Sequence, residues 1–126
     1  KKIKIFGGNQ TRPNIHIKDM IRVYEHFLET DQQPGIYNAG FENISILDLG
    51  KKIQKVIGCD IEITESNDPR SYRQCSDKLL SSGFKQLYTI DDAIIEIVKG
   101  FKNGHVKDDE SSYTVKWMKD RILNNG

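Results

Sequence analysis

The sequence has few cysteines, and none is spaced for a disulfide framework or a zinc site. Its 126 residues contain two cysteines, Cys59 and Cys75, no Cys-x-x-Cys pair and three scattered histidines. Small secreted domains usually carry several paired cysteines, and structural zinc sites need four ligands at short spacings. We therefore expect a cytoplasmic protein without a bound metal, in which both cysteines are chemically inert.

An excess of either charge and a long apolar run are missing as well. Nineteen Lys and Arg face eighteen Asp and Glu, and no apolar segment is long enough to cross a bilayer. The first residues also lack the apolar stretch of a signal peptide. The near-neutral balance argues against a polyanion-binding surface. We expect a protein that binds neither nucleic acid nor membrane.

Catalytic and cofactor motifs are absent too. The sequence has no glycine-rich dinucleotide fingerprint, no P-loop and no Gly-x-Ser-x-Gly elbow. Tyr72, Tyr88 and Tyr113 all lack a lysine four residues later, so a Tyr-x-x-x-Lys proton-transfer pair is missing. We expect no catalytic and no cofactor-binding residue in this segment, which alone should not transfer hydride.

What the sequence does contain is an alternation of strand and helix periods, which is typical of an α/β protein. The expected strands lie around Ile3 and Ile5, at 15–17, at 36–40 and at 60–64. The expected helices are capped, or opened, at Asp19, Ser45, Ser76 and Thr89. Four or five helices with short strands and no complete Rossmann domain should leave some apolar surface uncovered.

The polar interval 103–112 predicts a boundary within the chain. We expect a domain over residues 1–104, followed over 105–126 by a linker and a terminal helix with Val115, Met118, Ile122 and Leu123. The sequence begins with Lys-Lys-Ile and not with Met. We therefore expect it to be cut from a longer protein.

Two loops near predicted strand ends carry arginines. Pro13 restricts Arg12 to extended backbone, and Asp68 and Arg70 lie together on a second loop. A guanidinium keeps its charge and binds phosphate through a planar fork, so two such loops would hold a diphosphate if they converge. The plainer interpretation is a surface arginine and a local Asp68–Arg70 ion pair in a turn.

These residues belong to an ordered set along the chain, which comprises Phe6-Gly7-Gly8, Arg12 to Asp19, Tyr37-Asn38-Ala39-Gly40, Ser45, Asp68 to Tyr72, Lys78 and Gly83-Phe84. Its order and spacing over residues 1–104 resemble the C-terminal, substrate-binding part of the extended short-chain dehydrogenase/reductases, the NAD-dependent nucleotide-sugar epimerases and dehydratases. Cys75 and Glu65 depart from the pattern, because many members carry Asp and some carry Arg at those places.

The resemblance implies a substrate, a nucleotide-diphosphate sugar, and a role for each candidate residue. It assigns the nucleotide base to the backbone of a strand end, the diphosphate to two arginines and the ribose to an aspartate. The base would contact Ile5 and Phe6, the diphosphate Arg12 and Arg70, and the ribose Asp68. Tyr72 would be a further substrate contact.

The resemblance also implies what lies outside this sequence. NAD or NADP, the catalytic residues and the dinucleotide fingerprint would belong to a missing N-terminal Rossmann half, and the full-length enzyme of carbohydrate biosynthesis would be a homodimer. Two functions stay open: the sugar-nucleotide-binding part of such an enzyme, inactive alone, or a non-catalytic α/β protein-interaction module.

Overall fold

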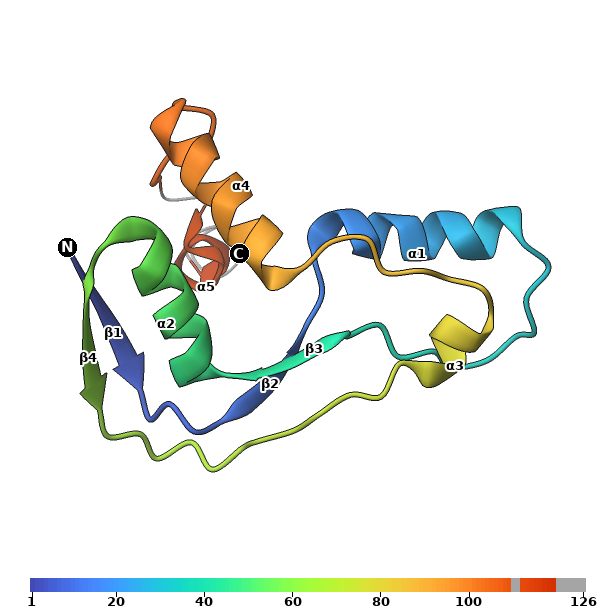
Figure 1. Ribbon diagram of the computed structural model, residues 1–126, viewed down its shortest axis with the longest axis horizontal. Coiled ribbons are helices and arrows are strands. Elements are labelled where there is room, and N and C mark those ends of the chain that lie inside the picture. Colours follow the sequence, from blue (N-terminus) through green and yellow to red (C-terminus); the bar gives the residue numbers. More distant parts are fainter. Residues whose placement is uncertain (110–111, 120–126) are drawn as a thin grey trace. The chain divides into compact units, whose positions relative to one another are not determined.

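Short strands and amphipathic helices alternate along the chain, so the predicted α/β class is confirmed. The structure, a computed structural model, describes residues 1–109 and 112–119. They fall into two units, Lys1–Glu96 and Ile97–Gly126. The elements (Figure 1) are β1 (Lys2–Phe6), β2 (Thr11–Asn14), α1 (Ile17–Glu29), β3 (Glu42–Ser45), α2 (Ile46–Ile57), β4 (Asp60–Thr64), α3 (Asp77–Ser81), α4 (Ile90–Lys102) and α5 (Thr114–Met118).

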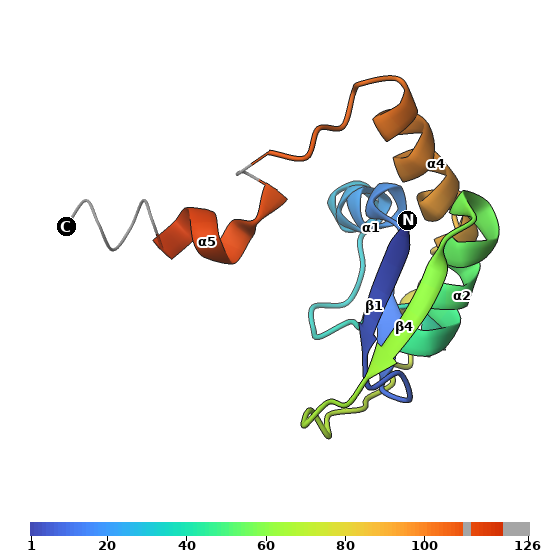
Figure 2. The ribbon, with the colours of Figure 1, turned by 90° about the vertical axis from the view of Figure 1, so that its left-hand side faces the viewer.

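Strands β1 and β4 form a parallel pair with α2 along one face (Figure 2). The pair runs in register from Lys2 opposite Asp60 to Phe6 opposite Thr64. Ile5 is buried beneath α2, where a Cβ on Gly50 would collide with its Cδ1 atom. The absence of a side chain at Gly50 therefore lets the helix approach the strand closely.

The second pair, β2 and β3, is antiparallel and leads directly into α2. Thr11 lies opposite Ser45, and Asn14 lies opposite Glu42. Ser45 then caps α2, since its Oγ accepts from the backbone N–H of Asp48 at 3.0 Å and donates to the Asp48 carboxylate at 2.6 Å. Ser45 is thus confirmed as the N-cap that the sequence predicts, although the Asp48 carboxylate returns to the Ser45 hydroxyl. The cap fixes where the chain turns from strand to helix.

A separate core gathers around α1 and α3. Val23, Leu79 and Phe84 are buried there, and Phe41 stacks on Phe84 with ring centroids 5.7 Å apart. Val23 comes from α1, Leu79 from α3 and Phe84 from the irregular segment after α3, whereas Phe41 directly precedes β3. Long-range packing, not a sheet, therefore organises this half of the first unit.

A buried carboxylate ties that segment to α1. Asp19 is fully buried, and its carboxylate accepts the backbone N–H groups of Leu87 and Tyr88 at 3.1 and 2.9 Å. Arg22 Nη1 donates to the same carboxylate at 2.5 Å. The prediction that Asp19 caps the helix was wrong. The cap is His16, whose Nδ1 accepts from the N–H of Lys18 at 3.1 Å, because α1 begins at Ile17.

Two predicted strands differ from the structure. Residues 36–40 have no regular structure, because a strand needs a partner and no strand of the described chain pairs with this segment. The extended piece predicted at 15–17 lies earlier, at Thr11–Asn14, and Ile17 already belongs to α1. In contrast, the strand predicted at 60–64 is β4 to the residue.

An apolar stripe on α1 is left uncovered, as predicted for some part of this fold. Its members follow one another at helical spacing of three or four residues, and the exposed fraction reaches 85% at the last of them. No helix in the described part of the chain is long and apolar enough to span a membrane. The stripe consists of Ile17, Ile21, Tyr24 and Leu28.

The second unit is small. Its described residues include the end of α4 and α5, and Tyr113 Oη donates to Asp108 at 2.8 Å just before α5. This bond raises the pKa of Tyr113. Val115 and Met118 lie in α5, where a terminal helix was predicted, whereas Ile122 and Leu123 lie outside the described residues.

Replacing Asp19 should strongly destabilise the fold. Asp19→Ala leaves two backbone N–H groups and a guanidinium without their buried acceptor, so we expect the free energy of unfolding to fall by about 3 kcal/mol. Asp91→Ala is the control, because Asp91 pairs with Lys52 on the surface, where ion pairs contribute little. Urea unfolding measures both, and equal losses would contradict the role assigned to Asp19.

Candidate functional site

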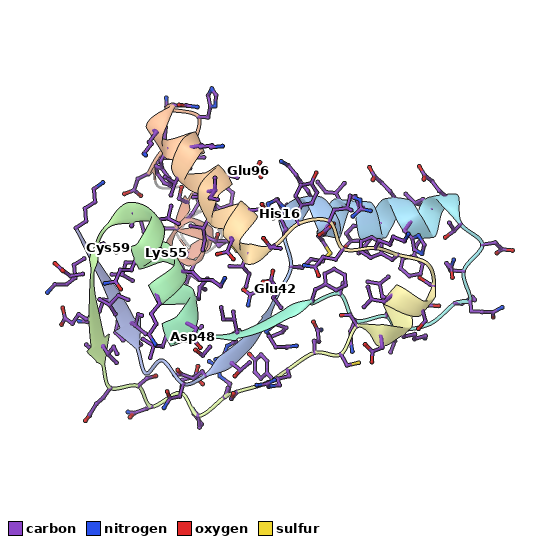
Figure 3. All side chains as sticks on the ribbon, viewed as in Figure 1. His16, Glu42, Asp48, Lys55, Cys59 and Glu96 are labelled. Carbon is purple, nitrogen blue, oxygen red and sulfur yellow. The ribbon has the colours of Figure 1, made fainter. Side chains whose placement is uncertain are left out.

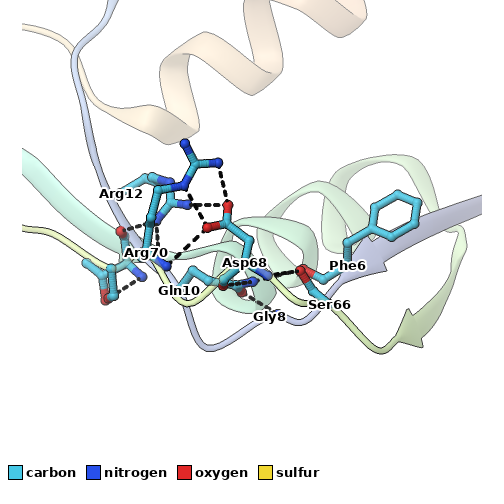
Figure 4. A network of polar contacts seen from close by, with 9 residues as sticks. Phe6, Gly8, Gln10, Arg12, Ser66, Asp68 and Arg70 are labelled. Carbon is cyan, nitrogen blue, oxygen red and sulfur yellow. Dashed lines mark hydrogen bonds and ion pairs between the residues drawn. The ribbon is translucent and has the colours of Figure 1, made fainter.

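The site is built where β1 ends and the irregular segment 65–76 passes beneath β2 (Figure 4). Gly7 and Gly8 have φ values of 79° and 120°, which favour glycine and end the strand. Gln10 joins the pieces: its Oε1 accepts from the N–H of Gly8 at 2.7 Å, and its Nε2 donates to the carbonyls of Phe6 and Asp68 at 3.3 and 3.4 Å.

Arg12 is held firmly at the centre of this site. Its Nη1 donates to the carbonyls of Thr11 and Arg70 at 3.0 and 2.6 Å. Its guanidinium lies over the ring of Tyr72, 4.7 Å from the centroid, in a cation–π contact. Its Nη2 donates to Asp68 Oδ2 at 3.3 Å. With 24% of the side chain exposed, Arg12 is fixed in place while one edge faces solvent.

Arg70 meets Arg12 on the same carboxylate. Its Nε donates to Asp68 Oδ1 at 2.7 Å and its Nη2 donates to Oδ2 at 2.9 Å, a two-point contact. The N–H of Arg70 adds a third bond to Oδ1 at 3.1 Å. Arg12 thus lies in strand β2 and not on a loop, and it meets the loop of Asp68 and Arg70 at this carboxylate. The local Asp68–Arg70 ion pair of the plainer interpretation forms at the same point.

The arginines control the charge of Asp68. Hydrogen bonds from the Arg70 side chain and backbone, with the charges of Arg70 and Arg12 behind them, lower the pKa of Asp68 to about 2. The same contact raises the pKa of Arg70. All three groups are ionised at neutral pH, so two cations and one anion leave the cluster with one net positive charge.

The other candidate residues lie beside this cluster. Phe6 is exposed at the end of β1, whereas the Ile5 side chain is buried, so that Ile5 can reach a ligand only through its backbone. Tyr72 supports Arg12 and its N–H donates to the carbonyl of Thr11 at 3.3 Å. Sequence analysis assigned no role to Gln10 or to Ser71. The Oγ atom of Ser71 accepts from the N–H of Thr11 at 3.0 Å. A lone polar side chain in a loop gives no signal that would have identified either.

A second polar cluster surrounds His16 (Figure 3). Because Nδ1 accepts the Lys18 N–H, Nε2 carries the proton and faces Glu96 Oε2 at 3.3 Å. The ring also stacks on Tyr88 at 4.9 Å. Lys18 lowers the pKa of Glu96. These contacts hold the capping residue His16 in place at the N-terminus of α1. Among residues 1–109 and 112–119 no group of three His, Cys, Asp or Glu side chains could hold a metal ion.

The titration of Asp68 should depend on Arg70. Because its pKa lies below the ordinary 3.8, the ion pair stabilises the fold above about pH 4, and this contribution is lost as the pH falls toward 2. Carboxyl-carbon NMR should give a midpoint near 2, and Arg70→Ala should raise it toward 3.8. Arg73→Ala should leave it unchanged. A wild-type midpoint near 3.8, or equal shifts in both variants, would contradict this geometry.

Known proteins resemble the chain in sequence over part of its length. No protein-family model matches it. Two proteins named dTDP-4-dehydro-6-deoxy-D-allose reductase, from Streptomyces bikiniensis and Streptomyces sp, are 41% and 39% identical over 59 residues. That stretch is 46% of this chain but only 18% of each relative, so most of each relative has no counterpart in the match.

Solved structures resemble the fold over more of the chain. The UDP-glucuronic acid 4-epimerase of Bacillus cereus, solved with UDP-glucuronic acid and NAD, matches 75% of this chain and 33% of its own, with a TM-score of 0.60 and 26% identity. The UDP-glucose 4-epimerase of Bifidobacterium longum, solved with NAD+ and UDP, matches 75% and 32%, with a TM-score of 0.58 and 23% identity. The resemblance drawn from the sequence is thereby confirmed: in sequence and fold this chain is similar to part of the extended short-chain dehydrogenase/reductases that modify nucleotide sugars.

Proposed function

We propose that this chain is the C-terminal, sugar-nucleotide-binding part of an NAD-dependent nucleotide-sugar epimerase, dehydratase or reductase. The observation that carries the proposal is the meeting of Arg12 and Arg70 on one carboxylate, although Arg12 lies in strand β2 and Arg70 in the distant segment 65–76. Two convergent guanidiniums beside a strand end form a site for a doubly charged ligand such as a diphosphate.

The rest of the site is consistent with the remainder of a nucleotide. Phe6 and the Gly7-Gly8 turn lie at the end of β1, and Gln10 connects this turn to the carbonyl of Asp68. A base set against the backbone of Ile5 and Phe6 would thus lie on the same connected set of loops as the arginines. Tyr72 would act through Arg12, which it holds in place.

The uncovered surface supports a missing partner domain. The stripe on α1 borders an open pocket of about 520 Å³ between this helix and the unpaired segment 32–39. Among its lining residues are Met20, Tyr24, Phe27 and Tyr37. Contiguous exposed apolar surface usually marks an interface. The similar epimerases are about three times as long as the matched part, so the rest of such a protein is the occupant we propose.

The chemistry would then belong to that other part. NAD or NADP would bind there, the catalytic residues would lie there, and the whole would be a homodimeric enzyme of cytoplasmic carbohydrate biosynthesis. This chain would contribute substrate binding: two fixed positive charges for the diphosphate and a strand end for the base. The reductases and epimerases it resembles act on sugars attached to nucleoside diphosphates, as their names state.

A protein-interaction module is the second candidate, because the stripe on α1 would equally suit a separate protein. The encoded sequence upstream of Lys1 discriminates between the two. A glycine-rich strand-turn-helix and a Tyr-x-x-x-Lys pair there would support the enzyme, whereas an unrelated domain would support the module.

Arg12 should determine sugar-nucleotide affinity in the longer enzyme. Arg12→Ala removes charge-assisted hydrogen bonds and should weaken binding by about 1.5–3 kcal/mol, roughly ten- to a hundredfold. Arg12→Lys should recover only part of the loss, because an ammonium keeps the charge without the fork. Calorimetric titration measures both, with Lys55→Ala on α2 as a charge control. NAD affinity should not change. Unaltered substrate affinity in Arg12→Ala would refute the diphosphate clamp.

The stripe on α1 should behave as an uncovered interface in the isolated chain. We expect strong binding of a fluorescent apolar dye, and we expect Ile21→Glu combined with Leu28→Glu to remove most of it. The melting temperature should stay nearly constant, because both side chains are exposed. A control pair, Ile53→Glu with Leu49→Glu on the partly buried side of α2, should instead lower it. Dye binding that survives the α1 variant would contradict an apolar interface there.

A further inference from the structure

The carboxylate of Asp68 occupies the point at which the two arginines converge. Arg12 Nη2 and Arg70 Nη2 both donate to its Oδ2 atom, at 3.3 and 2.9 Å. A phosphate that is to touch both guanidiniums along these edges must therefore take the place of this carboxylate. We propose that Asp68 is a resident anion of the site, which a phosphate group of the ligand displaces from Arg70 on binding. This inference rests on the proposed function.

Arg12 does not need Asp68 to keep its position. Two carbonyls accept from its Nη1 and the Tyr72 ring supports its guanidinium plane. Removing the Asp68 carboxylate deletes one long contact of 3.3 Å and leaves these three. Arg12 is thus the fixed side of the clamp.

Arg70 is the movable side. Its side chain is 70% exposed, and both of its side-chain hydrogen bonds go to Asp68, which is 29% exposed. A carboxylate and a phosphate both bind a guanidinium through two parallel bonds, so one can replace the other without loss of geometry. Exchange of partners requires only that the exposed side chain turn away from Asp68.

The exchange is competitive and does not rely on protonation. Two guanidiniums lower the pKa of Asp68 to about 2, so the carboxylate keeps its negative charge throughout the neutral range. That charge repels an incoming diphosphate and holds one of its two cations. Asp68 therefore keeps Arg70 ordered without a ligand, at the expense of ligand affinity.

Asp68→Asn tests the exchange directly in the 126-residue chain. The amide has nearly the same shape but no charge, so titration with inorganic pyrophosphate and with UDP should show affinity about tenfold higher than wild type, equivalent to about 1.4 kcal/mol. Asp68→Asn combined with Arg70→Ala should lose this gain, since the freed cation is Arg70. Equal or weaker binding by Asp68→Asn would overturn the inference and make Asp68 a residue that positions Arg70.

Two controls separate this result from general charge and folding effects. Glu65→Gln removes the same charge from an exposed side chain just after β4 and should change pyrophosphate affinity little. The Nε–H of Arg70 should exchange with water faster in Asp68→Asn and be protected again by saturating pyrophosphate. An equal gain in Glu65→Gln would overturn the inference.

The outcome also distinguishes this inference from the proposed function. If UDP-sugar binding depends on Arg12 but Asp68→Asn gives no gain, only the exchange is wrong. If neither pyrophosphate nor a UDP-sugar binds to any of these variants, both are wrong.

Discussion

The structure of the site depends on how the segment 65–76 is held, because this segment has no regular structure of its own. Backbone N–H and C=O groups away from water need hydrogen-bond partners, and in this segment side chains supply several of them. Asn43 pairs with both backbone groups of Gln74 at 2.8 and 2.9 Å, in the manner of a neighbouring strand. Ser76 does the same for Gly40, at 3.0 Å in each direction.

These hydrogen bonds fix the position of the segment 65–76 relative to β3. Asn43 lies in β3 and Gly40 lies just before it, so the segment follows the β2–β3 pair and reaches the Thr11–Ser71 contact. Only then do Asp68 and Arg70 come within reach of Arg12. Ion pairs so near the surface contribute little to stability. The hydrogen bonds of Asn43 and Ser76 therefore position the segment, and the ion pairs form as a consequence.

Sequence reasoning succeeded where a local rule applies. The helix N-caps at Ser45 and Thr89 follow from spacing alone. At Thr89 the full capping box forms, since Thr89 Oγ1 accepts from the N–H of Asp92 at 3.2 Å while its own N–H donates to that carboxylate. The strand at 60–64 follows from alternation. Arg12 and the Asp68–Arg70 loop do meet, although Arg12 lies in β2 and not on a loop, and their convergence on a diphosphate stays a prediction.

It failed where the outcome depends on distant partners. His16 caps α1 although histidine is not a preferred capping residue, because Glu96 and Tyr88 hold its ring in place. Asp19 is of a residue type that often caps helices, but it lies within α1 with its side chain buried, because the backbone N–H groups of Leu87 and Tyr88 donate to its carboxylate. Residues 36–40 have a strand-like sequence, but no strand of the described chain lies beside them. The match to the similar epimerase covers only 33% of that chain, so most of that fold has no counterpart here.

The central claim is that the end of β1, Arg12 on β2 and the loop of Asp68 and Arg70 together bind a nucleoside-diphosphate sugar. Backbone amide NMR of the chain during titration with a UDP-sugar and a dTDP-sugar tests it most directly. The account predicts that the largest shifts fall in residues 6–12 and 68–72, in both segments at once. Shifts confined to α1 and the segment 32–39, or shifts on only one of the two loops, would contradict it.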